Sequence, residues 1–312
     1  MYLVSWKLEF DSMATLYTHK SANIRKTWIL MSGFMLIIGL LGWLLSLYFE
    51  EIAIFYIFMV VSIFMTIISY WFSDRIVTSI AGAKEIESPP TGGNQELYRI
   101  VENLSIAAGL PTPKIYIIND PSPNAFATGR DPKHSIVAVT EGLLQMLDKP
   151  ELEGVLAHEL SHIGNRDMLV ATVAAVLAGV ITMIVDLMFR SRIMNSLGGR
   201  RKGGGIILLL LLVAAILAPI AAALIRFAVS RSRETLADAS GALLTRYPDG
   251  LARALVKISS STIPLKHAND MTSHLYISDP LKEERKTSFI AKLFLTHPPI
   301  EERIKLLRAM SI

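Results

Sequence analysis

The sequence contains no cysteine among its 312 residues. Disulfide bonds are therefore excluded, and so is any metal site built on thiolate ligands. A metal ion bound by this chain has to be held by nitrogen and oxygen atoms. Charged residues are also scarce, at 19%, whereas 52% of the residues are hydrophobic and the mean hydropathy is +0.43. So large an apolar share is unusual for a soluble globular protein of this size and indicates a membrane protein.

No secretory signal peptide is recognisable. The first apolar run follows 27 mostly polar residues, is too long for the apolar core of a signal peptide, and has no small-residue cleavage site behind it. We therefore expect this run to remain as a membrane anchor.

Four apolar runs are long enough to cross about 30 Å of hydrocarbon. They are residues 28–49, 52–72, 169–189 and 206–228. The third run contains Asp186 and the fourth contains Pro219, so a pair of buried core helices or a re-entrant hairpin is the alternative for these two. We expect four hydrophobic helices arranged as two hairpins.

The distribution of basic residues predicts the orientation in the membrane. Lys7, Lys20, Arg25 and Lys26 precede the first span, whereas the turn behind it holds only Glu50 and Glu51. This asymmetry predicts a cytoplasmic N-terminus, and two crossings later residues 73–168 are cytoplasmic as well. The loop at 190–202 carries five basic residues that this arrangement places outside. Either the second hairpin does not fully cross, or the first hairpin dominates the topology.

The net charge of +4 and the isoelectric point near 9.2 raise the question of nucleic-acid binding. The basic residues, however, cluster beside apolar runs, where anionic lipid headgroups attract them. We therefore expect the lipid bilayer as a partner and no nucleic acid.

The polar part behind the first hairpin predicts a small sheet between helices. A helix is expected at 95–108, because its apolar residues share one face and Gly109 ends it. Short strands at 114–118, 124–129 and 135–140 are separated by turns rich in Asn, Asp and Pro, which predicts an antiparallel meander. A short helix at 141–147 and a longer one from Pro150 follow.

The polar part behind the second hairpin predicts further helices. One ends near Tyr247, the next covers 250–260, and the last follows the sequence THPP. Residues 261–288 lack any periodicity and are interpreted as a long surface loop or a lid.

The longer helix from Pro150 contains the sequence HELSH. His158 and His162 lie one turn apart on one face, so both imidazoles can reach a single ion, and Glu159 projects beside them. The alternative is a surface helix with incidental histidines. It fits poorly, because the neighbouring residues are apolar. The spacing favours a zinc site with a glutamate as general base.

Two histidines leave a catalytic zinc ion one protein ligand short. The possible third ligands are Asp167, His134, Glu234, Asp238, His267, His274 and His297. Glu234 and Asp238 lie four residues apart, so on a helix one carboxylate can bind the metal while the other orients a ligand histidine. The alternative is a solvated helix face balanced by Arg231 and Arg233.

The sequences HELSHIGNRD, SRSRETLADASGA and THPP, in this order and between two apolar hairpins, resemble the HtpX-type membrane zinc metalloproteases. These are relatives of the prenyl-protein CAAX endopeptidases. The resemblance covers nearly the whole chain, whereas the HELSH motif alone would indicate only a zinc peptidase of some kind. It implies an α+β membrane protein, with a mainly helical, zincin-like catalytic domain and a small antiparallel sheet.

The resemblance also implies a role for each motif residue. His158, His162 and Glu234 correspond to the zinc ligands, Glu159 to the general base, and Asp238 to a supporting aspartate. His297 corresponds to a histidine that stabilises the developing oxyanion. Asn124, Ala125, Phe126 and Ala127 correspond to an edge strand on which the substrate backbone would add.

The expected reaction is hydrolysis of a peptide bond. One zinc ion lowers the pKa of its bound water toward about 7 and polarises the scissile carbonyl, while Glu159 takes the proton and returns it to the leaving amine. Because the metal-binding helix continues into a membrane run, the zinc lies near the cytosolic membrane surface. Membrane or misfolded proteins, as in protein quality control and the stress response, are the expected substrates.

The chain thus divides into an N-terminal cytoplasmic segment, a first hairpin, a catalytic part with sheet and HELSH helix, a second hairpin, and a C-terminal catalytic part. Their bounds are 1–27, 28–72, 73–168, 169–229 and 230–312. Two other functions are compatible with the motif. One is a zinc-dependent hydrolase of lipid or amide substrates, and the other is a scaffold whose zinc only joins two helices.

Overall fold

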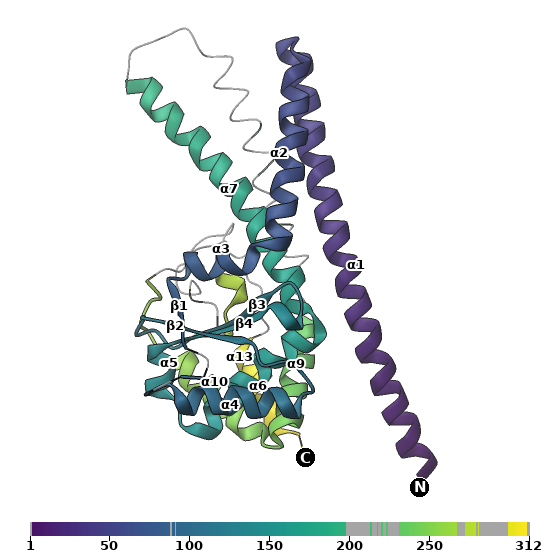
Figure 1. Cartoon of the computed structure of the whole chain (residues 1–312), viewed down its shortest axis with the longest axis vertical. Coiled ribbons are helices and arrows are strands. Elements are labelled where there is room, and N and C mark those ends of the chain that lie inside the picture. The colour runs from purple at the N-terminus through teal and green to yellow at the C-terminus, as the bar shows by residue number, and fades with distance from the viewer. Residues whose placement is uncertain are drawn as a thin grey trace.

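The computed structural model describes residues 2–87, 89–90, 92–197, 213, 217, 220, 223, 231–266, 272–278, 280 and 299–310. Two long antiparallel helices, α1 (Tyr2–Phe49) and α2 (Ile52–Trp71), form a hairpin whose tip extends far from the part that holds the sheet and most of the other helices, while the N-terminal end of α1 runs down beside that part (Figure 1). The first hairpin therefore forms as the apolar runs predict.

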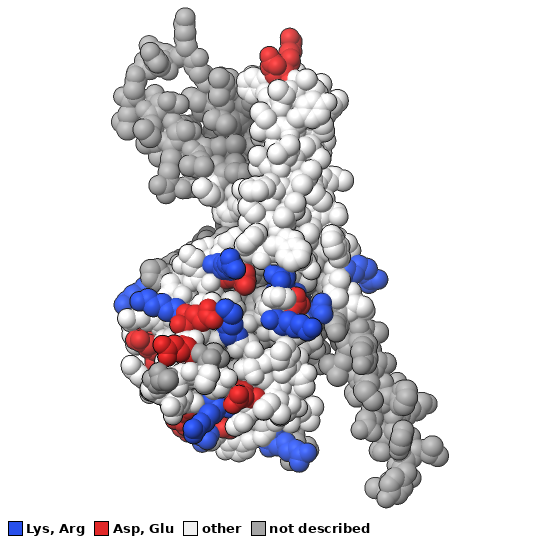
Figure 2. All heavy atoms as spheres, viewed as in Figure 1, with Lys and Arg blue, Asp and Glu red and all other residues white. Residues whose placement is uncertain are grey.

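The first hairpin has the length and the apolar surface of helices that insert into a membrane. Ser21–Phe49 of α1 and Ile52–Trp71 of α2 are long and apolar enough to cross a membrane, with mean hydropathies of 2.2 and 2.5. Large apolar side chains such as Leu36 and Val60 are exposed, as expected for helices that face lipid. On the face shown in Figure 2, the part of the hairpin that extends beyond the sheet-containing part has acidic residues at its tip and otherwise uncharged residues.

Glycine allows the two helices of the hairpin to approach closely. A Cβ atom on Gly42 would lie 2.5 Å from the Cβ of Phe58, and one on Gly39 would lie 2.8 Å from the sulfur of Met59. Small residues at such contacts are the usual means by which helices pack within a bilayer, where apolar side chains gain little from leaving lipid.

The second expected hairpin is described only in its first helix. Helix α7 (Asp167–Leu197) covers the third apolar run, and α6 (Lys149–Asn165) with the first part of α7 passes the same test as a single span bent by 84°. The run at 206–228 lies almost wholly outside the described residues; Val213 and Leu217 within it are buried against α1 and α7. The expectation of four hydrophobic helices therefore stays a prediction.

The sheet is mixed, so the predicted antiparallel meander is wrong. Its strands are β1 (Ala83–Glu85), β2 (Lys114–Ile118), β3 (Ala125–Gly129) and β4 (Ser135–Thr140), in the order β1-β2-β4-β3. Strands β3 and β4 form an antiparallel hairpin through a 3-10 turn (Pro132–His134), but β2 pairs with β4 in parallel. The turn residues in the sequence indicate where each strand ends. They do not indicate the strand order, in which β4 lies between β2 and β3.

The sheet is covered on both faces. Helix α3 (Ser73–Ile80) packs with Phe126 and Ala138 on one face, whereas Ala125 and Val139 belong to the core shared with α6. All residues of β3 and β4 are consequently buried. This arrangement fixes β3 directly beside the helix that carries the HELSH motif.

Helix α6 is the centre of the helical layer (Figure 1). Around it pack α4 (Gln95–Ala107), α9 (Arg231–Thr245) and α10 (Pro248–Ser260). Helix α13 (Ile300–Arg308) packs in turn on α10 and α9, and the short α5 (Glu141–Met146) lies beside the sheet. Helix α6 begins with a capping box between Asp148 and Glu151, and the buried Glu151 also binds Lys257 of α10 at 2.6 Å. The start of the motif helix is thereby tied to its neighbour.

Candidate metal centre

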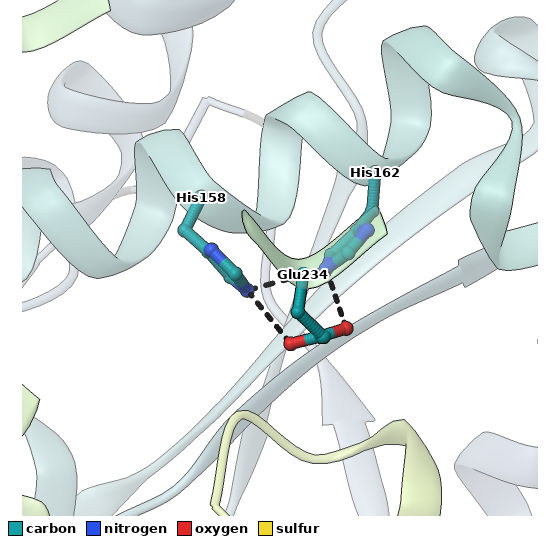
Figure 3. A group of neighbouring side chains, drawn as sticks. All are labelled: His158, His162 and Glu234. Atoms are coloured by element: carbon teal, nitrogen blue, oxygen red, sulfur yellow. Dashed lines mark hydrogen bonds and ion pairs between the residues drawn. The ribbon is translucent and has the colours of Figure 1, made fainter. Parts of the chain in front are cut away.

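The two histidines of α6 converge as the spacing predicts. Because they lie one turn apart, their Nε2 atoms approach to 3.2 Å. Glu234, in the first turn of α9, lies opposite, with its carboxylate oxygens 3.9 Å from Nε2 of His158 and 3.6 Å from Nε2 of His162. Figure 3 shows the carboxylate pointing at both rings. Of the possible third ligands that lie within the described residues, Glu234 is thus the one that the structure brings to the Nε2 atoms of both histidines.

This group fits a catalytic zinc ion. Two imidazole nitrogens and one carboxylate oxygen form a common donor set for such a site. A tetrahedral ion with bonds of about 2.0–2.1 Å keeps its ligand atoms roughly 3.3 Å apart, which the separations here approach. Among the described residues the metal-capable group has three members, so a tetrahedral ion held by these three alone would keep one position for water or substrate.

Glu159 lies beside this group in a small cavity. Its side chain is buried, and burial raises the pKa of the carboxyl group above its usual value. The cavity measures about 50 Å³ and is lined in part by Glu159, Ala127 of β3, His274 and Ile277. A space of this size holds only a few water molecules and is far smaller than a pocket for an organic ligand.

Asp238 lies against His158, as the predicted supporting role requires. Its carboxylate oxygen is 3.0 Å from Nδ1 of His158, the ring nitrogen that faces away from the metal group. Arg303 of α13 donates two hydrogen bonds to the same carboxylate, at 2.7 and 2.8 Å. Burial alone would raise the pKa of Asp238, but the charge and hydrogen bonds of Arg303 hold it below its usual value. Asp238 is therefore ionised and is placed to accept a hydrogen bond from a protonated Nδ1 of His158.

Asp167 occupies the equivalent position beside the second histidine. Its carboxylate is 3.3 Å from Nδ1 of His162. Burial alone would lower the pKa of His162, but the hydrogen bond to Asp167 and the negative charge of Glu234 outweigh it and raise the pKa to about 9. The sequence pattern offered Asp167 as a possible metal ligand, whereas the structure places it behind a ligand.

Arg303 is a residue of the site that the sequence reasoning missed. It is almost completely buried, at 1% exposure, although it is charged. The available signal was its position on α13, where it shares the inward face with Ile300 and Leu307 at helical spacing. A buried arginine at such a position needs a carboxylate partner, and Asp238 is that partner.

Helix α9 reaches α6 because Gly241 allows close contact. A Cβ atom at this position would lie 2.9 Å from the backbone nitrogen of His158 and 3.1 Å from its Cα. The two backbones therefore meet at the first histidine of the HELSH motif. This contact brings Glu234, two turns earlier on α9, within reach of the metal group.

The expected substrate residues are buried under another part of the chain. The backbone N–H of Ile277 donates to the carbonyl of Ala125 at 3.0 Å, and the side chain of Asn124 donates to the carbonyl of Ser278 at 2.9 Å. Phe126 meets Tyr276 edge to face, with 5.1 Å between ring centroids. The segment 276–278 thus lies along the edge of β3 that is not paired with β4.

The other histidines considered from sequence lie elsewhere. His134 is exposed in the turn before β4 and binds Asp131. His274 lines the cavity, and its Nε2 lies 3.2 Å from the carbonyl oxygen of Ala171. His267 and His297 lie outside the described residues, so the expected oxyanion role of His297 stays a prediction.

Two histidines from one helix, a glutamate from a second and a buried glutamate in the intervening cavity define a metallopeptidase site on a helical scaffold. Comparison with known proteins gives the particular family. The profile of peptidase family M48 matches residues 92–311. The chain belongs to this family, which confirms the resemblance seen in the motifs, and it is a membrane metallopeptidase.

Several curated relatives match over nearly their full length. A protein named "Protease HtpX homolog" from Dictyoglomus thermophilum is 49% identical over 298 residues, covering 95% of both chains. One of the same name from Caldanaerobacter subterraneus subsp. tengcongensis is 44% identical over 304 residues, covering 96% of this chain and 99% of the relative. The crystal structure of S. mikatae Ste24p matches with a TM-score of 0.46 and 17% identity, over 98% of this chain and 67% of that one.

Proposed function

We propose that this chain is a zinc-dependent endopeptidase that cleaves membrane or misfolded proteins at the membrane surface. The single observation that supports it most is the convergence of His158, His162 and Glu234 beside the buried Glu159. His158, His162 and Glu234 would hold one zinc ion, which when bound acidifies a water molecule and polarises the scissile carbonyl.

Glu159 is the proposed proton carrier. It lines the same cavity as the three ligands, so a water molecule there lies within its reach. The pKa raised by burial brings the carboxyl group closer to neutral pH, at which a general base works best. After taking the proton from water, Glu159 returns it to the leaving amine. His297 is proposed to donate to the developing oxyanion, as the resemblance implies.

The edge of β3 is the proposed substrate site. An extended peptide added to this edge would hydrogen-bond to the backbone at Asn124, Ala125, Phe126 and Ala127. The segment 276–278 supports the geometry, because its backbone already makes such a bond to Ala125. Ala127 lines the metal cavity, so a peptide on this edge would pass beside the zinc ligands.

The proposed setting is the cytoplasmic face of a cell membrane crossed more than once. The N-terminal end of α1 and the sheet-containing part lie at the same end of the molecule, and the hairpin tip lies at the other (Figure 1). The basic residues before the first span favour the cytoplasm for the end with the metal site. Substrates emerging from the bilayer would reach the site directly.

The test is the Glu159→Gln variant of the purified full chain in detergent. We expect it to retain one zinc ion per chain by metal analysis and to lose about 10²- to 10⁴-fold in casein cleavage, the range for loss of a general base. Glu153→Gln on the same helix is the matched control and should cleave like the wild type. A Glu159→Gln protein with zinc and wild-type activity would disprove the mechanism.

A further inference from the structure

The corner between α6 and α7 places Asp167 behind a metal ligand. Helix α6 ends at Asn165, Arg166 takes a left-handed conformation with φ 57°, and α7 begins at Asp167 after a bend of 84°. This sharp turn directs the Asp167 carboxylate back toward His162, the last histidine of the motif. The orientation of His162 consequently depends on how firmly the corner is held.

One side chain from the first membrane helix holds this corner. Nδ2 of Asn23 in α1 donates to the carbonyl of Asn165 at 3.0 Å and to Oδ1 of Asp167 at 2.6 Å. The carbonyl of Asn165 is in the last turn of α6, where it has no partner within its own helix. The other oxygen of Asp167, Oδ2, is the one that faces His162.

Asn23 is buried, with 2% exposure, although it lies 144 residues from Asp167 in the sequence. A buried amide without hydrogen-bond partners is unfavourable, so its two bonds favour the docking of α1 against the corner. Asp167 also lies near a charged group, because its Oδ1 is 3.8 Å from Nη1 of Arg233. Asp167 thus has a charged partner in Arg233, whereas Asn23 bonds both to the last residue of α6 and to the first residue of α7.

We propose that Asn23 is a positioning residue for the metal centre, because it fixes Asp167 so that Asp167 orients His162. This inference rests on the proposed zinc site. Carboxylates that bind the second nitrogen of a ligand histidine fix its tautomer and ring orientation, and their loss typically weakens metal binding about 10- to 100-fold. Docking of the first membrane helix and binding of the metal are then coupled.

The test is zinc affinity of the full chain in detergent, measured against a competing chelator. We expect Asp167→Asn to weaken binding about 10- to 100-fold and Asn23→Leu about tenfold. The double variant should bind about as weakly as Asp167→Asn alone, since Asn23 acts through Asp167. Ser46→Ala, at a buried polar position near the far end of α1, is the matched control.

A second pair of variants separates positioning from folding. In Asn23→Asp combined with Asp167→Asn, a donor and an acceptor again face each other, so thermal stability should recover relative to Asn23→Asp alone. Zinc affinity should stay low, because the carboxylate no longer faces His162. The absorption spectrum of the cobalt-loaded protein reports ligand geometry independently of activity and should shift in both Asn23→Leu and Asp167→Asn.

These measurements distinguish failure of the proposed zinc site from failure of the proposed role of Asn23. If the wild type itself binds no zinc, the proposed function fails. If the wild type binds zinc and Asn23→Leu binds it equally well, only the role of Asn23 fails. Two further results would overturn the role of Asn23. One is a loss of zinc affinity in the Asn23→Leu, Asp167→Asn double variant that equals the sum of the two single losses. The other is recovery of both stability and zinc affinity in the protein that combines Asn23→Asp with Asp167→Asn.

A different observation supports a second proposal, at the edge of β3. Ile277 and Ser278 are held there by three hydrogen bonds, one to Ala125 and two with the side chain of Asn124. Tyr276 beside them is 1% exposed. With this segment in place the cavity at the metal group is about 50 Å³, too small for an extended peptide.

We infer that the segment 276–278 competes with substrate for β3 and has to leave before a peptide binds. This inference rests on the proposed use of β3 as the substrate site. A single backbone hydrogen bond contributes about 0.5–1.5 kcal/mol, so losing one would shift the equilibrium toward the open edge by roughly 2- to 10-fold.

The test is Ile277→Pro, which removes the N–H that binds Ala125. Tyr276 has φ −77° and ψ 147°, a conformation that a following proline permits. We expect casein cleavage by Ile277→Pro to rise roughly 2- to 10-fold. Ile277→Val keeps the N–H that binds Ala125, so its activity should change far less than that of Ile277→Pro. Unchanged or lower activity in a folded Ile277→Pro protein would overturn the inference.

Hydrogen exchange provides a measurement that needs no change to this segment. In the Glu159→Gln protein, which should bind but not cut, addition of unfolded casein should accelerate exchange of the Ile277 amide. If casein binds and this amide keeps its protection, substrate and segment 276–278 do not compete.

Discussion

At the scale of single residues, each of the two histidines of the HELSH motif has its own carboxylate partner. Asp238 contacts His158, and Asp167 contacts His162. The two partners differ in what stabilises them, because Arg303 neutralises Asp238 through two hydrogen bonds, whereas Asp167 relies on the amide of Asn23 and the more distant Arg233. The Asp238 side is thus held by a full charge pair, and the Asp167 side is held more weakly.

The contact between Asp167 and His162 leads to a prediction on how stability and zinc affinity depend on pH. His162 has a pKa near 9 in the metal-free protein, above the value of 6.5 for the unfolded chain. Its protonation therefore contributes stability that is fully present below pH 6.5 and is lost as the pH rises to about 9. Zinc requires the neutral imidazole, so its apparent affinity should rise about tenfold per pH unit between pH 7 and 8.5 and level off near 9.

Zinc titration with a competing chelator at several pH values measures this dependence. Asp167→Asn removes the hydrogen bond that raises the pKa of His162, so its zinc affinity should level off at a lower pH. An affinity that does not change between pH 7 and 9 in the wild type would show that His162 is already neutral there.

At the scale of elements, the packing of α9 on α6 determines whether Glu234 lies close to the two histidines. The sequence placed Glu234 and Asp238 on one helical face, and this follows from helical spacing alone. That the face turns toward α6 depends on the absence of a side chain at Gly241, which permits contact with the backbone of His158.

Gly241→Ala is therefore predicted to be destabilising. Its methyl group would force α9 away from α6, at a cost of about 1–3 kcal/mol, and would move Glu234 away from the histidines. Thermal unfolding and zinc affinity measure the two effects. Gly164→Ala on α6 is the control, because its Cβ atom would meet only Leu110, at 3.8 Å, and alanine favours a helix by up to about 1 kcal/mol. Equal behaviour of the two variants would contradict the packing argument.

At the same scale, the sheet shows which features local sequence patterns can predict and which they cannot. Strands β2, β3 and β4 lie close to the expected ranges, since alternation and turn residues mark them locally. Their order could not be predicted, because pairing β2 with β4 depends on how β3 folds back on the outer side of β4. Strand β1 was not predicted at all, since its three residues carry no alternating pattern.

At the scale of the whole molecule, the metal site lies directly below the membrane hairpin. Helix α7 continues from the motif helix into the apolar region, and α1 touches the same corner through Asn23. Helices α1 and α7 thus meet at the corner beside the metal group, and α7 leads upward from it in Figure 1.

The absence of cysteine allows a clean test of orientation. Glu51→Cys at the hairpin tip and Glu96→Cys on α4 replace the same residue type at exposed positions. With a membrane-impermeant maleimide, we expect Glu51→Cys to be labelled in intact cells and Glu96→Cys only after permeabilisation. The reverse pattern would show that the metal site faces outward.

The sequence alone determined the features that repeat within one element. The spacing in HELSH, the four-residue step from Glu234 to Asp238 and the length of the first two apolar runs each follow from a helical period or from bilayer thickness. The tertiary structure alone decided which distant groups meet. Asn23 binds Asp167 across 144 residues, Arg303 binds Asp238 across 65, and Asn124 binds Ser278 across 154. No local period encodes such contacts, because they arise only when packed elements bury polar groups that then require partners.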